Sequence, residues 1–119
     1  MTVRAIEHVQ LAMPPGGEPR AVAFYAGLLD LPQRQKPAEL ARRGGCWFES
    51  DDVKLHLGVE TEFRPARKAH PALLVDDLTS LRERLRAAGY ECAEPDRFEG
   101  HDRTYVDDPF GNRIELIGA

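Results

Sequence analysis

The chain has 119 residues, of which 42% are hydrophobic and 30% are charged, and its formal net charge is −4. This length fits one compact domain, and the mild acidity argues against nucleic acid as a main partner. No apolar run approaches the ~18–20 residues of a membrane-spanning helix, and charges interrupt the apolar stretch near the start, so we expect neither a membrane partner nor a secretory signal.

Alternating apolar and polar residues predict a first strand over residues 6–13. The proline- and glycine-rich stretch Pro14–Pro19 cannot continue it. Apolar residues at helical spacing then predict a helix over about residues 18–30, which ends at Asp30-Leu31-Pro32 because proline disfavours helix at the residue before it. Residues 33–43 fit no single pattern.

The sequence after Gly44-Gly45 predicts a hairpin. Residues 46–49 and 53–59 read as its strands, and Ser50-Asp51-Asp52 has the composition of a turn. Residues 61–68 form a polar linker.

The second half begins with an apolar strand over residues 70–75. Asp76-Asp77 then offers a helix N-cap, and Gly89 stands where a helix-ending residue is expected. Three further strands are predicted, with the turn DDPFGN between the last two. These strands cover residues 90–93, 103–106 and 114–117.

The order strand–helix–strands occurs twice, which predicts an α+β fold of two tandem modules, at about residues 4–60 and 67–118 of a single domain. When the modules are aligned by their elements, His8 corresponds to His70, and His56 corresponds to Glu115. Taken singly, each is more commonly a solvated strand residue. Their equivalent places in the repeat favour a shared site.

Three imidazoles and one carboxylate suit a divalent metal such as Zn, Fe, Ni, Mn or Co. The subset His8, His70 and Glu115 would make a two-histidine, one-carboxylate triad. His56 is either a further ligand or a neighbour that protonates or binds substrate.

Several segments resemble the vicinal-oxygen-chelate superfamily, which includes glyoxalases, bleomycin-resistance proteins and extradiol dioxygenases. These segments are HVQLAMP, AFYAGLLDL, GGCWF, LHLGVE, AHPALLVDDL and YVDDPFGNRIELIG, and they cover nearly the whole chain. The resemblance implies two tandem βαβββ modules that curl into an open, cupped β-sheet barrel with helices outside. It also implies a metal held by His8, His56, His70 and Glu115. His56 departs from the glyoxalase I pattern, which commonly has glutamate there.

The resemblance implies an enzyme that chelates two neighbouring oxygens of a small substrate on the metal, as a lyase or isomerase of the glyoxalase type or as a dioxygenase. Glu115 would be the base in proton transfer, and Arg103 and Tyr105, which share a strand face, could contact the substrate near it. The alternative is a metal-free protein of the bleomycin-resistance type that sequesters a small drug-like molecule.

Other residues could assist either function. Arg64, Arg67 and Lys68 could attract an anionic substrate, although a solvated linker is the more common explanation of such a cluster. If Trp47 faces inward, its ring could form one side of a site for a flat ligand. The sequence predicts that His101 is a surface residue.

Two cysteines, Cys46 and Cys92, without a secretory signal favour free thiols and a cytoplasmic location. The resemblance also implies a homodimer. In relatives of this length the modules of two chains often complete each barrel, and a site within one chain stays the alternative.

Overall fold

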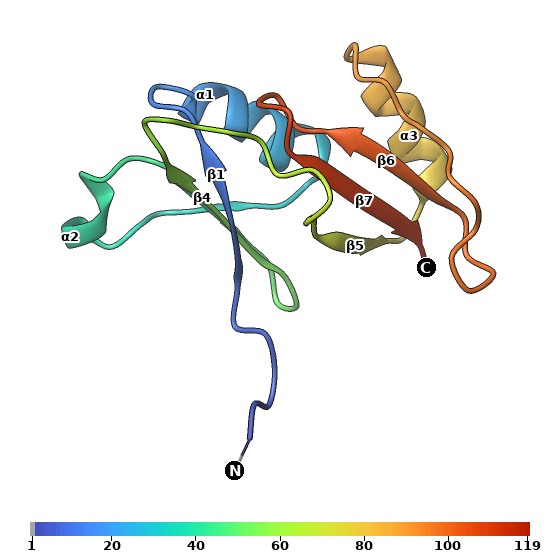
Figure 1. Cartoon of the computed structure of the whole chain (residues 1–119), viewed down its shortest axis with the longest axis horizontal. Helices are drawn as coiled ribbons and strands as arrows, with labels where there is room; N and C mark the ends of the chain where they lie inside the picture. The colour runs from blue at the N-terminus through green and yellow to red at the C-terminus, as the bar shows by residue number, and fades with distance from the viewer. Residues whose placement is uncertain (1) are drawn as a thin grey trace. The chain divides into compact units, whose positions relative to one another are not determined.

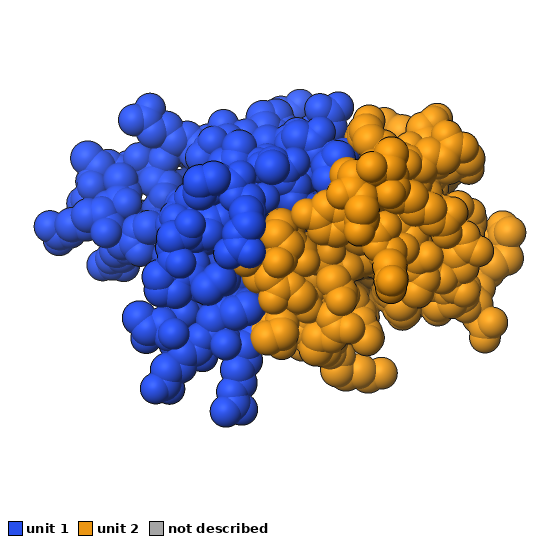
Figure 2. Space-filling model, turned by 90° about the horizontal axis from the view of Figure 1, so that it is seen from above, with its two compact units in different colours: residues 1–64 blue, residues 65–119 orange. Residues whose placement is uncertain are grey.

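The computed structural model describes residues 2–119 (Figure 1). The chain forms two compact units, Met1–Arg64 and Pro65–Ala119, which Figure 2 shows in blue and orange. Within the described residues, every helix is too short or too polar to cross a membrane. Cys46 and Cys92 are both free thiols, as predicted.

Unit 1 (residues 1–64) holds a four-stranded sheet with the strand order β1-β4-β3-β2. Its elements are β1 (Val9–Met13), α1 (Glu18–Ala21), the π-helical segment η1 (Val22–Leu28), β2 (Gln33–Arg34), α2 (Ala38–Ala41), β3 (Cys46–Glu49) and β4 (Lys54–Val59). β1 runs parallel to β4, and the other neighbours are antiparallel. The predicted helix and hairpin are thus confirmed, and the stretch without a clear pattern supplies β2 and α2.

One face of this sheet forms the core of unit 1, because side chains alternate between the two faces of a strand. Tyr25 of η1 stacks on Phe48 of β3 on this face, with 5.3 Å between ring centroids. The buried apolar side chains include Leu11, Met13, Phe24, Leu55 and Leu57. The opposite face therefore carries the polar residues of the same strands, His56 among them.

The first strand begins at Val9, so its predicted start at residue 6 is wrong. β4 begins at Lys54, and Val9 already pairs with Leu55, so the chain before His8 has no strand to pair with. Ile6 is accordingly 80% exposed. His8 lies directly before the strand rather than within it.

Unit 2 (residues 65–119) holds a three-stranded sheet with the order β5-β7-β6. Its elements are β5 (Ala72–Val75), α3 (Leu78–Ala87), β6 (Arg103–Asp107) and β7 (Arg113–Gly118). Its first and last strands, β5 and β7, run parallel, as β1 and β4 do in unit 1. The protein therefore has the predicted mixed α+β fold, with the same pairing of first and last strands in both halves.

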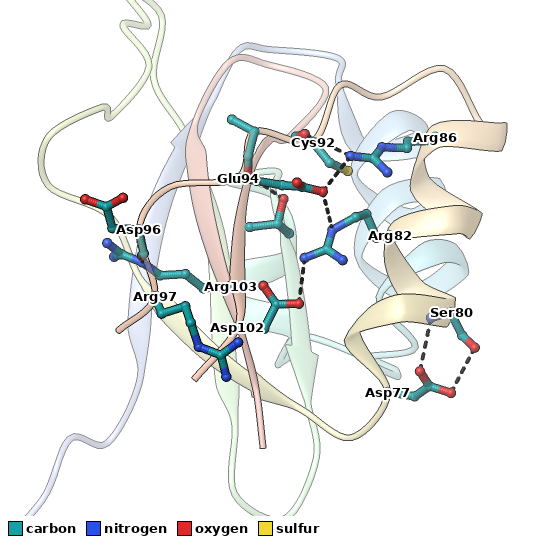
Figure 3. A network of polar contacts seen from close by, with 12 residues as sticks. Asp77, Ser80, Arg82, Arg86, Cys92, Glu94, Asp96, Arg97, Asp102 and Arg103 are labelled. Carbon is teal, nitrogen blue, oxygen red and sulfur yellow. Dashed lines mark hydrogen bonds and ion pairs between the residues drawn. The ribbon is translucent and has the colours of Figure 1, made fainter. Parts of the chain in front are cut away.

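Helix α3 begins and ends where the sequence predicts. Asp77 caps it by accepting a hydrogen bond from the Ser80 N–H at 3.0 Å (Figure 3). Gly89 ends it with a φ of +93°, a conformation that favours glycine. The buried Leu81 and Leu85 lie on its apolar side, and α3 packs against β7.

The predicted strand over residues 90–93 is wrong, since this segment makes only one isolated strand-like pair, between Ala93 and Tyr105. Arg86 donates to the Cys92 carbonyl, and the Ala93 carbonyl accepts from the Thr104 hydroxyl as well as from the Tyr105 N–H. Ion pairs from α3 hold the chain that follows, from Arg86 to Glu94 and from Arg82 to Asp102 (Figure 3).

Candidate functional site

His70 and Glu115 form a close pair in unit 2. His70 lies two residues before β5, and Glu115 lies on β7, whose Glu115 N–H donates to the Pro71 carbonyl at 3.0 Å. His70 Nε2 is 2.8 Å from Glu115 Oε1, and the two side chains are 17% and 8% exposed. The parallel pairing of the first and last strands of this unit thus brings two of the predicted ligands together.

The second ring nitrogen of His70 determines the chemistry of this pair. Nδ1 lies 2.9 Å from the Lys68 carbonyl oxygen, which can only accept, so Nδ1 carries the proton. Nε2 faces Glu115 Oε1, and an ionised carboxylate oxygen can likewise only accept a hydrogen bond. A cation must therefore join Nε2 and Oε1, and this cation is either a proton on Nε2 or a metal ion in its place. A backbone carbonyl on the other nitrogen is also the usual support of a metal-binding histidine, so the pair fits a divalent first-row metal.

Arg103 and Tyr105 of β6 lie beside Glu115. The strand register places Tyr105 directly across from Glu115. Arg103 Nη1 donates to Glu115 Oε2 at 3.0 Å and to the Tyr105 hydroxyl at 3.2 Å. The rings of Tyr105 and His70 meet edge to face, with 5.6 Å between centroids. Both oxygens of Glu115 therefore have a nitrogen partner.

These partners keep Glu115 ionised. Burial is the largest single effect and raises the pKa of Glu115, but the hydrogen bonds and charges of His70 and Arg103 together outweigh it. The net result is a pKa of Glu115 below its ordinary value. At neutral pH the group is an anionic electron-pair donor.

In unit 1, His56 lies between two other rings. Trp47 stacks on it with 4.3 Å between centroids and 7° between planes, and His8 stacks on it at 4.4 Å and 18°. His56 Nε2 is 2.7 Å from Glu49 Oε2, and these two side chains are 6% and 10% exposed. Arg34 also pairs with Glu49, at 2.9 Å. The hydrogen bond from His56, followed by that from Arg34, holds the pKa of Glu49 below its ordinary value despite burial.

The sequence did not single out Glu49. It follows Phe48 at the end of a short strand and resembles any acidic residue before a turn. Its place on the same strand face as Trp47, two residues earlier, was the one available signal. Trp47 lies on the opposite face of the strand from the buried Phe48. Its ring is covered by Arg34 and His56, so it is not available to stack on a flat ligand.

The four predicted ligands thus occur as two pairs, His8 with His56 in unit 1 and His70 with Glu115 in unit 2. Across residues 2–119, no group of three or more histidine, cysteine, aspartate or glutamate side chains is arranged to hold an ion. Binding of one ion by all four residues stays a prediction.

The basic residues before His70, namely Arg64, Arg67 and Lys68, differ in their contacts. All three are exposed, and the charge of Arg67 is compensated because it pairs with Asp107 at 2.7 Å and donates to the Gly111 carbonyl. A pocket of about 450 Å³ in unit 2 is lined in part by Arg67 and Tyr105. This pocket shares Tyr105 with the surroundings of the His70–Glu115 pair.

His101 is a surface residue, as predicted, and Asn112 lies in the predicted DDPFGN turn. His101 is exposed and lies 2.9 Å from the Gly118 carbonyl through Nδ1. Asn112 is buried in the turn, where its amide donates to Asp108 and accepts from the Ala66 N–H. Asn112 therefore has a structural role.

Known protein structures match this chain along its whole length. A glyoxalase family protein from Bacillus anthracis is 41% identical with a TM-score of 0.93, and the match covers 99% of this chain and 97% of that one. The fosfomycin resistance protein FosX from Listeria monocytogenes is 16% identical with a TM-score of 0.78, over 99% and 95% of the two chains. A superfamily member from Sphaerobacter thermophilus is 16% identical with a TM-score of 0.76, over 98% of each chain. At 16% identity, the last two show a shared fold only.

No curated protein sequence matches the chain significantly. The sequence model of the Glyoxalase/Bleomycin resistance protein/Dioxygenase superfamily matches residues 6–116, which is almost the entire chain. Together with the 41% identical structure, this match shows that the chain belongs to the Glyoxalase/Bleomycin resistance protein/Dioxygenase superfamily.

Proposed function

We propose that the protein is a metal-dependent enzyme that binds two neighbouring oxygens of a small substrate at a divalent metal ion. His70 and Glu115 would be ligands of this ion, with His8 and His56 as the further ligands predicted from the repeat. The observation that carries the proposal is the 2.8 Å contact between His70 Nε2 and the Glu115 carboxylate, in a ring whose Nδ1 is held by the Lys68 carbonyl at 2.9 Å. When bound, a divalent ion supplies the positive charge that stabilises negative charge developing on substrate oxygens.

Glu115 is better suited to bind an ion than to act as the general base. Both of its oxygens accept hydrogen bonds, and its pKa is lowered, so it takes up a proton less readily than an ordinary carboxylate. Arg103 holds one oxygen and leaves the other directed at His70. We therefore assign Glu115 the role of a ligand and Arg103 the role of orienting it.

Tyr105 is suited to contact the substrate. Arg103 donates to its oxygen, so the phenol O–H is free to donate to another acceptor. The Tyr105 ring contacts His70 and also lines the pocket. Its hydroxyl would therefore be within hydrogen-bonding distance of a substrate oxygen bound near His70 and Glu115.

Metal analysis of protein purified without a histidine tag tests this function. We expect a stoichiometric divalent ion in the wild type, its loss in His70→Ala, and its retention in His101→Ala, which removes an exposed histidine elsewhere. A thermal-shift panel with Zn, Ni, Mn, Co and Fe(II) should raise the melting temperature of the wild type only where an ion binds the folded state. Absence of metal in every preparation, together with tight binding of a drug-like compound, would support sequestration instead.

A further inference from the structure

A ladder of planar groups crosses the polar face of the unit 1 sheet. The strand register pairs Arg34 with Trp47 and Trp47 with His56, so their side chains share this face. The Arg34 guanidinium lies 5.5 Å from the centre of the Trp47 ring, and Trp47 stacks on His56. His8 stacks on the other side of His56. Because a ring covers each of its faces, the His56 imidazole cannot turn over without breaking this ladder.

Glu49 holds the edge of the same imidazole. Its Oε2 lies 2.7 Å from His56 Nε2, and its Oε1 accepts from Arg34 at 2.9 Å. A carboxylate that is paired with a guanidinium is ionised and can only accept. His56 Nε2 must therefore carry a proton, and in the neutral ring Nδ1 holds the lone pair.

Nδ1 of His56 has no hydrogen-bond partner in the described part of the chain. Among side-chain nitrogen and oxygen atoms of residues 2–119, only Arg82 Nε is fully buried without a hydrogen-bond partner. Nδ1 is thus neither hydrogen-bonded nor fully buried, in a side chain that is 6% exposed.

We propose that Glu49 is a positioning residue that fixes the Nε2–H form of His56 and so makes Nδ1 the atom through which His56 binds the divalent ion. The metal part of this inference rests on the proposed function, whereas the effect of Glu49 on the imidazole does not. A carboxylate that accepts a hydrogen bond from the far nitrogen of a metal-binding histidine orients the ring and raises its basicity.

The form of His56 can be measured in metal-free protein by long-range ¹H–¹⁵N NMR of the ring, above the pH at which the ring is protonated. We expect a protonated Nε2 and an unprotonated Nδ1 in the wild type. Glu49→Gln has nearly the same shape but no charge, and its amide can also donate, so we expect a mixture of the two neutral forms. Glu39→Gln, an exposed glutamate in α2, should leave the His56 signals unchanged. A wild-type ring protonated on Nδ1, or one unaffected by Glu49→Gln, would overturn the positioning role.

The metal part is tested by titrating Co²⁺ or Zn²⁺ against a competing chelator. We expect Glu49→Gln to weaken affinity about 10–100-fold, the usual loss when the hydrogen-bond partner of a metal-binding histidine is removed. Glu39→Gln should bind as the wild type does, and Glu49→Asp should recover part of the loss. In a His56→Ala background, Glu49→Gln should have no further effect.

The outcomes separate the two proposals. If the wild type binds metal and Glu49→Gln binds equally tightly, the inference is wrong and the proposed function stands. If the wild type binds no metal, the proposed function and the metal part both fail, and the NMR result still decides whether Glu49 positions His56.

Discussion

At the scale of single residues, the candidate site depends on which ring nitrogens carry protons. His70 donates through Nδ1 to a backbone carbonyl and directs Nε2 at Glu115. In His56 too, Nε2 faces a glutamate, Glu49, and the two rings differ at Nδ1, which is bonded to a carbonyl in His70 and has no hydrogen-bond partner in His56 among the described residues. The proposed ion would therefore bind His70 in place of the proton at Nε2 and His56 through Nδ1.

Arg103 should control the ionisation of Glu115. We expect Arg103→Gln to raise the pKa of Glu115, because the variant removes the guanidinium that favours the carboxylate. NMR titration of the Glu115 carboxyl carbon measures this pKa directly. Arg113→Gln is the matched control, because Arg113 stacks over Tyr105 without contacting Glu115.

The same variant should change stability with pH. The pKa of Glu115 is lowered on folding, so its ionised form stabilises the protein above its unfolded pKa of about 4.3 and loses this effect as pH falls through the folded value. Urea unfolding should therefore find Arg103→Gln less stable than the wild type at pH 7, with a smaller difference at pH 3. An equal difference at both pH values would argue against an electrostatic origin.

The sequence could indicate the ligand-type residues but not their partners. Histidine is rare in this chain, and the predicted ligand histidines occupy equivalent positions in the two halves of the repeat, so they can be recognised as candidates. Glu49 is one of many acidic residues, and its role follows from a strand register that composition does not reveal.

At the scale of elements, the parallel pairing of first and last strands organises each half. Elements with a strong period were predictable, such as β4 and α3, because burial of one face requires that period. The segment 90–93 was not, since it pairs with β6 only at Ala93, and the Arg86 side chain binds the Cys92 carbonyl in place of a neighbouring strand. A pattern within one segment carries no information on such competition from distant side chains.

Helix α3 should contribute to stability through its buried side. Leu85 is fully buried, so Leu85→Ala should lower the free energy of unfolding by about 2–5 kcal/mol through the cavity it leaves. Glu83 is exposed on the same helix, and Glu83→Ala should change it by less than about 0.5 kcal/mol. Urea denaturation of both variants measures these values, and equal losses would contradict the packing described for unit 2.

At the scale of the whole molecule, we expect a homodimer. The homodimer stays a prediction from the family resemblance. Size-exclusion chromatography with light scattering should give about twice the chain mass of 13.3 kDa. A mass of one chain across the micromolar range would contradict this expectation.

The central claim is that His70 Nε2 and Glu115 bind a divalent metal ion. A crystal structure of protein loaded with Zn²⁺ or Co²⁺, with anomalous data at the metal edge, tests it most directly. We expect one ion about 2.0–2.2 Å from His70 Nε2 and from a Glu115 oxygen, with Nδ1 still bonded to the Lys68 carbonyl. An ion bound elsewhere, or an unchanged 2.8 Å contact between His70 and Glu115 with no ion beside it, would contradict the claim.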